Sequence, residues 1–393
     1  MTENARMRRG PAPGGTKRLL ALDGGGIRGL ISIEIAGRLE TLLRSALGAG
    51  ADFVLADYFD YIAGTSTGAI IATALSLGYR VDQVRTLYLE GAKAMFRRAP
   101  LLKQLHYRNV ATYLTTRLRE LLRGADGEEL TLGTDALRTL LLVVMKNATT
   151  NSPWPLSNNP AAMFNDRSRD GCNLDLPLWQ IVRASTATPT LFPPEDVTVG
   201  GQRYVFVDGA VSVYNNPAFL LFLMATLPEY RLGWQTGEEK LLLVSIGTGA
   251  FSGGSPALQA SHMNLLYNAM SVPLALIEAA HTEQDVLCRV FGRCRCGGPI
   301  DSEIGDFIQT EEAVARDGGG PFWPKKFTYL RYDPDISSEG LAALGLPGIR
   351  SEDVQKMDSP SHVADLVAVG KAYAATLDLS HFGNFPVAPA RDR

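Results

Sequence analysis

The stretch from Arg18 to Leu30 constrains the fold most, because it joins an apolar strand to an apolar-periodic helix through three consecutive glycines, Gly24, Gly25 and Gly26. Glycines carry no side chains, so a ligand can approach the main chain closely and the N–H groups can point outward. The first turn of the following helix adds unpaired N–H groups and a partial positive charge. The stretch therefore predicts a site for a negative oxygen, which belongs either to a bound phosphate or to a reaction intermediate.

The composition excludes several classes of protein. The chain has 393 residues, 46% of them apolar and 20% charged, which is enough for one large α/β domain with additions or for two ordinary domains. Its net charge of −3 provides no basic field for nucleic acid. No apolar run approaches the ~20 residues of a transmembrane helix, and no signal peptide precedes the glycines. We therefore expect a cytoplasmic protein without a transmembrane segment.

The four cysteines are few for this length, which fits reduced thiols. Cys288, Cys294 and Cys296 lie close together, but their spacing matches no standard zinc pattern. We predict neither a metal nor a cofactor.

Strands alternate with helices from residue 18 to residue 249, which indicates an α/β fold with a mainly parallel sheet and helices on both faces. Residues 147–159 are rich in Asn, Thr, Ser and Pro and are predicted to be a loop. Strands are expected at about 18–22, within 53–63, and at 138–145, 204–207, 241–246 and 327–332. Helices are expected at about 28–46, 69–75, 81–123, 174–185, 257–290 and 361–377, with another opened by Asn215, Asn216 and Pro217.

A second glycine motif follows the second strand. Gly64-Thr65-Ser66-Thr67-Gly68 lies between that strand and a helix of small residues, the setting of a nucleophile elbow. Gly64 and Gly68 flank the sharp turn, where larger side chains would collide with the neighbouring strand or helix. The hydroxyl of Ser66 is then exposed at the top of the sheet. The alternative is a tight turn with a satisfied serine.

A serine hydroxyl is a poor nucleophile until a base takes its proton. None of the five histidines lies in a glycine motif at a strand end, whereas Asp208 ends a strand that we expect to be buried and is followed by Gly209. Because α/β sheets place catalytic groups at the carboxyl ends of strands, Asp208 is a candidate general base. A plain turn is the alternative for Asp208-Gly209 alone.

Gly24 to Gly29 also fits the dinucleotide fingerprint Gly-x-Gly-x-x-Gly. That motif requires an acidic residue closing the second strand, where this chain instead has the Ser66 motif. The mismatch favours chemistry at the serine, and a nucleotide-binding module remains the alternative.

Together these motifs resemble the patatin-like phospholipases. The resemblance rests on Asp23 to Gly29, Gly64 to Gly68, Ala184 to Phe192, and Asp208-Gly209-Ala210 with Asn215-Asn216-Pro217, and it covers roughly residues 18–225 in the family's order. It implies a three-layer α/β/α fold and a Ser–Asp dyad, with Ser66 as nucleophile and Asp208 as base. It also implies an oxyanion hole formed by Gly24, Gly25 and Gly26 with Arg28 beside them.

The resemblance further implies a lipid acyl hydrolase that contacts membranes peripherally and acts on phospholipids or lysophospholipids. Some bacterial members resemble effectors gated by a cyclic nucleotide, so this form of regulation is a second alternative. We expect a disordered leader at 1–16, a catalytic core at 17–250 and a C-terminal extension at 251–393 packed on the core. The last region carries no motif of the family.

Overall fold

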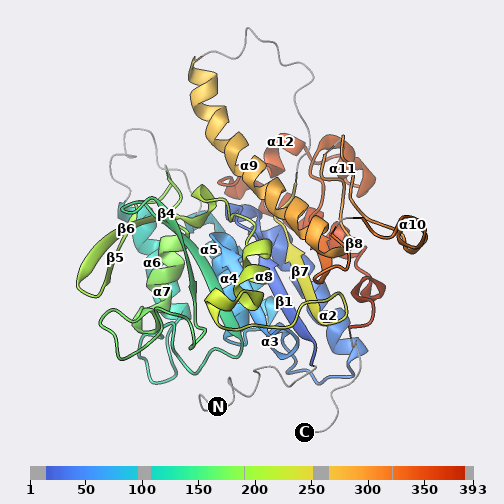
Figure 1. Ribbon diagram of the computed structural model, residues 1–393. Coiled ribbons are helices and arrows are strands. Elements are labelled where there is room, and N and C mark those ends of the chain that lie inside the picture. Colours follow the sequence, from blue (N-terminus) through green and yellow to red (C-terminus); the bar gives the residue numbers. More distant parts are fainter. Residues whose placement is uncertain are drawn as a thin grey trace.

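The computed structural model describes residues 15–95, 108–189, 191–250, 265–301, 303–320 and 322–385. Most of the expected leader and residues 251–264 therefore lie outside the described part of the chain. Within it, nine strands form one sheet in the order β5-β6-β3-β2-β1-β7-β9-β8, with β4 paired to β3 (Figure 1). The strands are β1 (Lys17–Leu22), β2 (Tyr61–Thr65), β3 (Leu140–Asn147), β4 (Ser152–Ser157), β5 (Glu195–Val199), β6 (Gln202–Asp208), β7 (Leu241–Ile246), β8 (Arg293–Cys296) and β9 (Thr328–Tyr332).

The centre of the sheet is parallel, as predicted from the alternation of strands and helices. β1 pairs in parallel with β2 on one side and β7 on the other, and β3, β9 and β8 continue the parallel order. The antiparallel pairs are β3 with β4, β3 with β6, and β5 with β6. All parallel strands therefore end at the same edge of the sheet, where the glycine turn and Ser66 lie.

Helices cover both faces of the sheet, which confirms the three-layer architecture. Alternate residues of β1 face opposite ways: Leu20 and Leu22 belong to one apolar core, while Leu19 and Ala21 belong to the other. The longer helices are α2 (Gly29–Ala46), α4 (Thr67–Ser76), α5 (Val81–Met95), α6 (Arg108–Leu121), α7 (Leu178–Ser185), α8 (Ala218–Thr226), α9 (Leu265–Phe291) and α13 (Val363–Ala374). The shorter ones are α3 (Leu55–Tyr58), α10 (Glu311–Asp317), α11 (Ser338–Ala343) and α12 (Ser351–Val354). The first core packs under α2, α4, α7 and α13, and the second under α8 (Figure 1).

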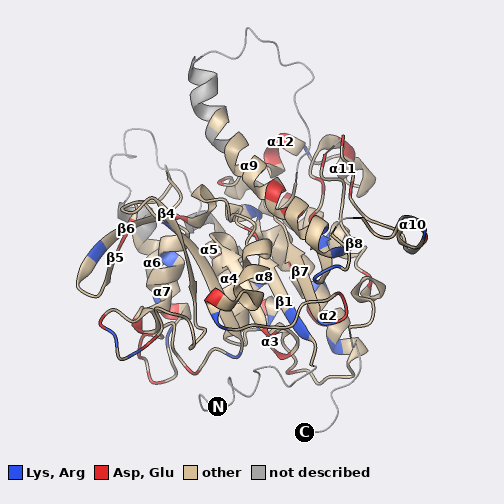
Figure 2. Ribbon diagram, viewed as in Figure 1, with Lys and Arg blue, Asp and Glu red and all other residues tan. Residues whose placement is uncertain are grey.

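Charge follows this layering. Figure 2 shows central strands with few charged residues, whereas lysines, arginines and acidic residues are interspersed over the outer helices and loops of the described chain. None of the described helices is both long enough and apolar enough to cross a bilayer.

Two predictions of local structure were wrong. The strand expected within 53–63 begins only at Tyr61, because residues 55–58 form α3. The side chain of Asp57 accepts a hydrogen bond from the Val54 N–H at 3.0 Å, a contact that stabilises the first turn of a helix.

The loop expected at 147–159 contains β4, which pairs with β3. Asn147 and Asn151 form the turn between them, with Asn151 at a φ of 53°. Trp154 then packs against Tyr204 and Phe206 of β6. The sequence did not indicate this strand because of Pro153 and Pro155. Proline has no backbone N–H to donate and is therefore confined to the edges of sheets.

The part of the chain after residue 250 contributes strands to the sheet. β9 lies where a strand was predicted and pairs with β7, and β8 extends the sheet beyond it. The division into a core and an extension stays a prediction, but β9 brings Arg331 and Asp333 close to the end of β1.

Candidate active site

Ser66 lies on the sharp turn between β2 and α4. Its backbone has a φ of 55° and a ψ of −123°, a strained conformation that costs roughly 1–3 kcal/mol and persists only where the surroundings enforce it. A Cβ atom on Gly64 would lie 2.1 Å from the carbonyl oxygen of Gly68, and one on Gly68 would lie 2.2 Å from that of Leu22. The two glycines therefore allow the close approach of β1, β2 and α4 that creates the turn.

A buried serine, Ser185, accepts a hydrogen bond from the backbone of this turn. The Ser66 N–H donates to Oγ of Ser185 at 2.9 Å, and Ser185 donates to the carbonyl oxygen of Val144 at 2.6 Å. Ser185 is the last residue of α7, and Val144 is in β3. The turn is thus tied to a helix and a strand that come much later in the chain.

The structure brings Ser66 and Asp208 together. Oγ of Ser66 donates to Oδ2 of Asp208 at 2.8 Å. The same carboxylate oxygen accepts a hydrogen bond from Thr188 at 2.5 Å, and Oδ1 accepts one from the Ala210 N–H at 2.8 Å. Burial raises the pKa of Asp208, and the hydrogen bonds from Thr188, Ala210 and Ser66 oppose that rise.

Asp208 reaches this position differently from what the sequence suggested. β6 is antiparallel to β3 and half exposed, not a buried strand of the parallel set. Only its last three residues pair with β3, and Asp208 lies opposite Met145 near the carboxyl end of β3. The first residues of β6 therefore lie beyond the carboxyl end of β3, and β6 itself ends close to where the parallel strands end.

The glycine turn lies directly beside Ser66. A Cβ atom on Gly24 would lie 3.2 Å from Cβ of Ser66 and 2.2 Å from Oδ1 of Asn215. On Gly25 it would lie 2.2 Å from Oγ1 of Thr248, and Gly26 has a φ of +59°. Each of the three positions thus requires glycine for a separate steric reason.

The Gly24–Gly25 peptide has a defined orientation. The carbonyl oxygen of Gly24 accepts hydrogen bonds from Thr248 Oγ1 at 3.2 Å and Asn215 Nδ2 at 3.4 Å. In a planar trans peptide the following N–H points the opposite way, so the Gly25 N–H faces away from Thr248 and Asn215. Within the described chain we find no hydrogen-bond acceptor for the Gly25 or Gly26 N–H. Both donors are available to an anionic oxygen.

Arg28 is buried in the helix start that follows the glycines. Its Nη1 donates to the carbonyl oxygen of Gly249 at 3.4 Å. Burial lowers its pKa, and the negative charges of Glu278, Asp333 and Asp23 oppose that effect. The guanidinium therefore faces the loop after β7.

None of the three described histidines hydrogen bonds to Ser66 or Asp208. His362 contacts Asp365, and His381 contacts Tyr332. His281 of α9 contacts Asn215 and Arg331.

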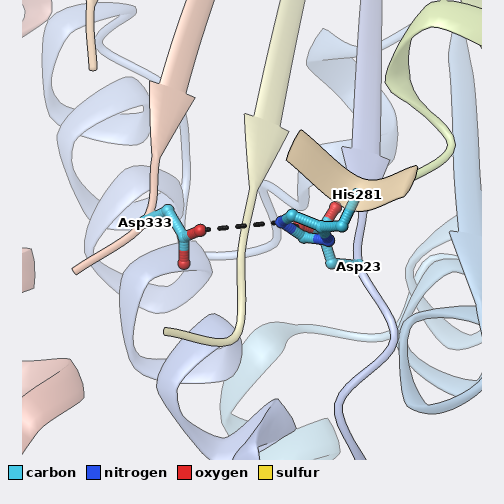
Figure 3. A group of neighbouring side chains, drawn as sticks. All are labelled: Asp23, His281 and Asp333. Atoms are coloured by element: carbon cyan, nitrogen blue, oxygen red, sulfur yellow. Dashed lines mark ion pairs between the residues drawn. The ribbon is translucent and has the colours of Figure 1, made fainter. Parts of the chain in front are cut away.

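A buried ion cluster lies next to the glycine turn. Asp23, His281 and Asp333 converge from β1, α9 and the end of β9 (Figure 3). Their side chains are of the kind that bind metal ions, but Nη2 of Arg331 lies within 2.6–2.8 Å of an atom of each of them. The guanidinium thus takes the position that a cation would need.

Sequence reasoning missed several residues of the site. Ser185 and Thr188 lay within a recognised motif but had no assigned role. Thr248 had a usable signal, since it lies between two glycines directly after a buried strand. No pattern in the sequence pointed to Arg331 or His281.

Comparison with known proteins identifies the family. The family model described as patatin-like phospholipase matches residues 20–222, which is more than half of the chain. The protein belongs to the patatin-like phospholipase family.

Individual relatives agree with this assignment. The chain is 30% identical over 234 residues to the cGAMP-activated phospholipase of Escherichia coli (strain TW11681), covering 59% of this chain and 62% of that one. It is 31% identical over 251 residues to Patatin-17 of Solanum cardiophyllum, covering 60% and 61%. The matches thus span less than two thirds of these relatives. Among solved structures, VipD from Legionella pneumophila is similar at 15% identity and a TM-score of 0.39, covering 93% of this chain and 67% of that one.

Proposed function

We propose that this protein is a lipid acyl hydrolase that cleaves acyl esters of phospholipids or lysophospholipids through a Ser66–Asp208 dyad. The observation that carries the proposal is the 2.8 Å hydrogen bond from the Ser66 hydroxyl to the Asp208 carboxylate, beside two glycine N–H groups that have no acceptor among the described residues. A buried carboxylate with a raised pKa is a suitable general base for a hydroxyl within hydrogen-bond reach.

This geometry supports the following reaction. Asp208 takes the proton of Ser66 as the Ser66 oxygen attacks the carbonyl carbon of the ester. The N–H groups of Gly25 and Gly26 stabilise the tetrahedral oxyanion, an effect worth about 3–4 kcal/mol per donor in comparable sites. The proton then passes from Asp208 to the leaving alcohol, and the acyl group remains on Ser66. In the second half, Asp208 takes a proton from the water that attacks the acyl-enzyme, and it passes that proton to the Ser66 oxygen as the fatty acid leaves.

Family membership supports a lipid as the substrate. Exposed apolar residues close to Asp208 in the chain, Val211 and Val213, also support a substrate with an acyl chain.

The proposal is tested with vesicles of mixed phospholipids and lysophospholipids and identification of the products by mass spectrometry. Ser66→Ala and Asp208→Asn are expected to lower fatty-acid release by at least ~1,000-fold while the fold is retained. Ser361→Ala and Asp126→Asn make the same chemical changes at exposed positions and are expected to retain full activity. Full activity of either dyad variant would refute the dyad.

The name of the Escherichia coli relative favours a second candidate, a phospholipase activated by a cyclic nucleotide. In that case cGAMP increases lipid hydrolysis by the wild type and still binds to Ser66→Ala. A nucleotide-binding module that uses the glycine turn would instead lose binding on substitution of Gly25. Isothermal titration of both variants with cGAMP separates these possibilities.

A further inference from the structure

Arg331 lies at the centre of a buried cluster of hydrogen-bonded side chains. Nη2 of Arg331 donates to Oδ2 of Asp23 at 2.6 Å and to Oδ2 of Asp333 at 2.7 Å, and it lies 2.8 Å from Nε2 of His281. Nη1 donates to Oγ of Ser245 at 2.7 Å. Arg331 is 2% exposed and Asp23 is fully buried. Because a buried charge costs several kcal/mol unless it is paired, loss of the guanidinium would leave the Asp23 and Asp333 carboxylates unfavourably placed.

The register of the sheet explains how Arg331 reaches the end of β1. Arg331 lies opposite Ser245 of β7, which in turn lies opposite Ala21 of β1. The Arg331 side chain therefore crosses over β7, contacts Ser245 on the way and meets Asp23, two residues beyond Ala21. A shorter or less planar cation could not make all four contacts at once.

Three contacts connect this guanidinium to the glycine turn. The first is direct, because Asp23 precedes Gly24 in the chain. The second runs through His281, whose Nδ1 lies 3.4 Å from Nδ2 of Asn215. That Asn215 amide donates to the Gly24 carbonyl oxygen, and the backbone oxygen of Asn215 accepts from the Gly24 N–H at 3.1 Å.

The third contact runs through Asp333. Its Oδ1 accepts a hydrogen bond from the Gly249 N–H at 2.8 Å. Gly249 follows Thr248, which is the other donor to the Gly24 carbonyl oxygen. Both groups that orient the Gly24–Gly25 peptide are thus linked to residues that Arg331 contacts.

We propose that Arg331 is a positioning residue that holds the Gly24–Gly25 peptide in the orientation that stabilises the oxyanion. The inference rests on the proposed function and deepens it. Arg331, His281 and Asp333 all lie after residue 222, outside the segment that matches the family. In this proposal the part of the chain after the matched segment supports the glycine turn, and Arg331 acts on the oxyanion hole only through the residues it contacts.

The test compares Arg331→Lys and Asp23→Asn with the wild type on a soluble short-chain ester. A trifluoromethyl ketone serves as the probe, because serine hydrolases bind such ketones as tetrahedral adducts whose oxyanion occupies the same hole as the intermediate. For both variants we expect kcat to fall about tenfold to a hundredfold with little change in KM. We expect the inhibition constant of the ketone to rise by a similar factor.

Arg289→Lys is the matched control. Arg289 is also a buried arginine, paired with Asp285 at 2.7 Å on α9, but within the described residues it makes no hydrogen bond to those that hold the glycine turn. A similar loss of stability with an unchanged inhibition constant is expected there. A merely structural role of Arg331 would lower the fraction of active enzyme and leave the inhibition constant of that fraction as it is in the wild type.

Asp333→Asn keeps Arg331 and supplies the test if Arg331→Lys does not fold. An inhibition constant at the wild-type value in every variant that folds overturns the inference. Absence of ester hydrolysis by the wild type would instead overturn the proposed function, so the two failures are distinguishable.

Discussion

The hydroxyl of Ser66 donates a 2.8 Å hydrogen bond to Asp208, although 142 positions separate the two residues in the chain. The proton that a general base has to remove therefore already lies on the line between the two oxygens. Because the acceptor is buried and has other donors, its pKa can be changed without altering the dyad itself.

Replacing Thr188 is expected to shift the pH dependence of hydrolysis. Thr188 donates to the oxygen of Asp208 that faces Ser66, and this bond lowers a pKa that burial has raised. Thr188→Val removes the bond, so the pKa rises further and the acid limb of the kcat/KM profile moves to higher pH. A pH–rate profile of the soluble ester measures the shift.

Thr186→Val is the control for this change, because Thr186 is a neighbouring threonine that donates to the Arg183 carbonyl oxygen instead. We expect its profile to match the wild type. A shift to lower pH in Thr188→Val would contradict the assignment of Asp208 as the base.

Removing the hydroxyl of Ser185 is expected to loosen the turn that carries Ser66. Ser185→Ala deprives the Ser66 N–H of its acceptor and the Val144 carbonyl of a donor. Leaving buried polar groups unpaired costs about 1–3 kcal/mol, and kcat is expected to fall as well. Urea denaturation and ester kinetics measure the two effects.

Ser351→Ala is the control that separates the loss of stability from the loss of kcat. Ser351 is also buried and donates to the carbonyl oxygen of Ile336. We expect a loss of stability there with an unchanged kcat. An equal kcat in Ser185→Ala and the wild type would mean that the turn needs no such anchor.

Substituting Gly64 is expected to destabilise the whole domain. The Cβ of Gly64→Ala would lie 2.1 Å from the backbone oxygen of Gly68, which cannot move aside as a side chain could. We expect a loss of about 3 kcal/mol or more in the free energy of unfolding, measured by urea denaturation.

Gly348→Ala provides the comparison, since no atom lies within 4 Å of the added Cβ there. Its free energy of unfolding is expected to change by less than about 0.5 kcal/mol. Similar stability of the two variants would show that β2 and α4 can separate at little cost.

Replacing the three described histidines tests whether one of them completes a triad with Ser66 and Asp208. His362→Asn and His381→Asn are expected to keep hydrolysis within about threefold of the wild type, because neither residue contacts the dyad. His281→Asn is expected to lower kcat by less than a hundredfold, as a partner of Arg331. Loss of a true general base costs about 10,000-fold or more, so steady-state kinetics distinguish the two roles.

Local sequence was enough to predict the glycine turn, the turn around Ser66 and the parallel centre of the sheet. The reason is that each depends on neighbours in the chain: glycines where a Cβ has no room, apolar runs before them and periodic helices after them. Local sequence did not predict β4, because its two prolines favour a loop. It also did not predict α3, whose first turn is stabilised by the hydrogen bond between Asp57 and Val54.

What only the tertiary structure decided is which distant groups meet. The direction of β6, the support of Ser66 by Ser185 and the crossing of Arg331 over β7 to Asp23 all depend on strand order and register. Burial in the folded protein also raises the pKa of Asp208 above its ordinary value, and the hydrogen bonds that oppose the rise come from residues distant in the chain as well as near it. The residue types in the sequence thus determined which reactive groups the chain has, and packing determined where these groups lie relative to one another.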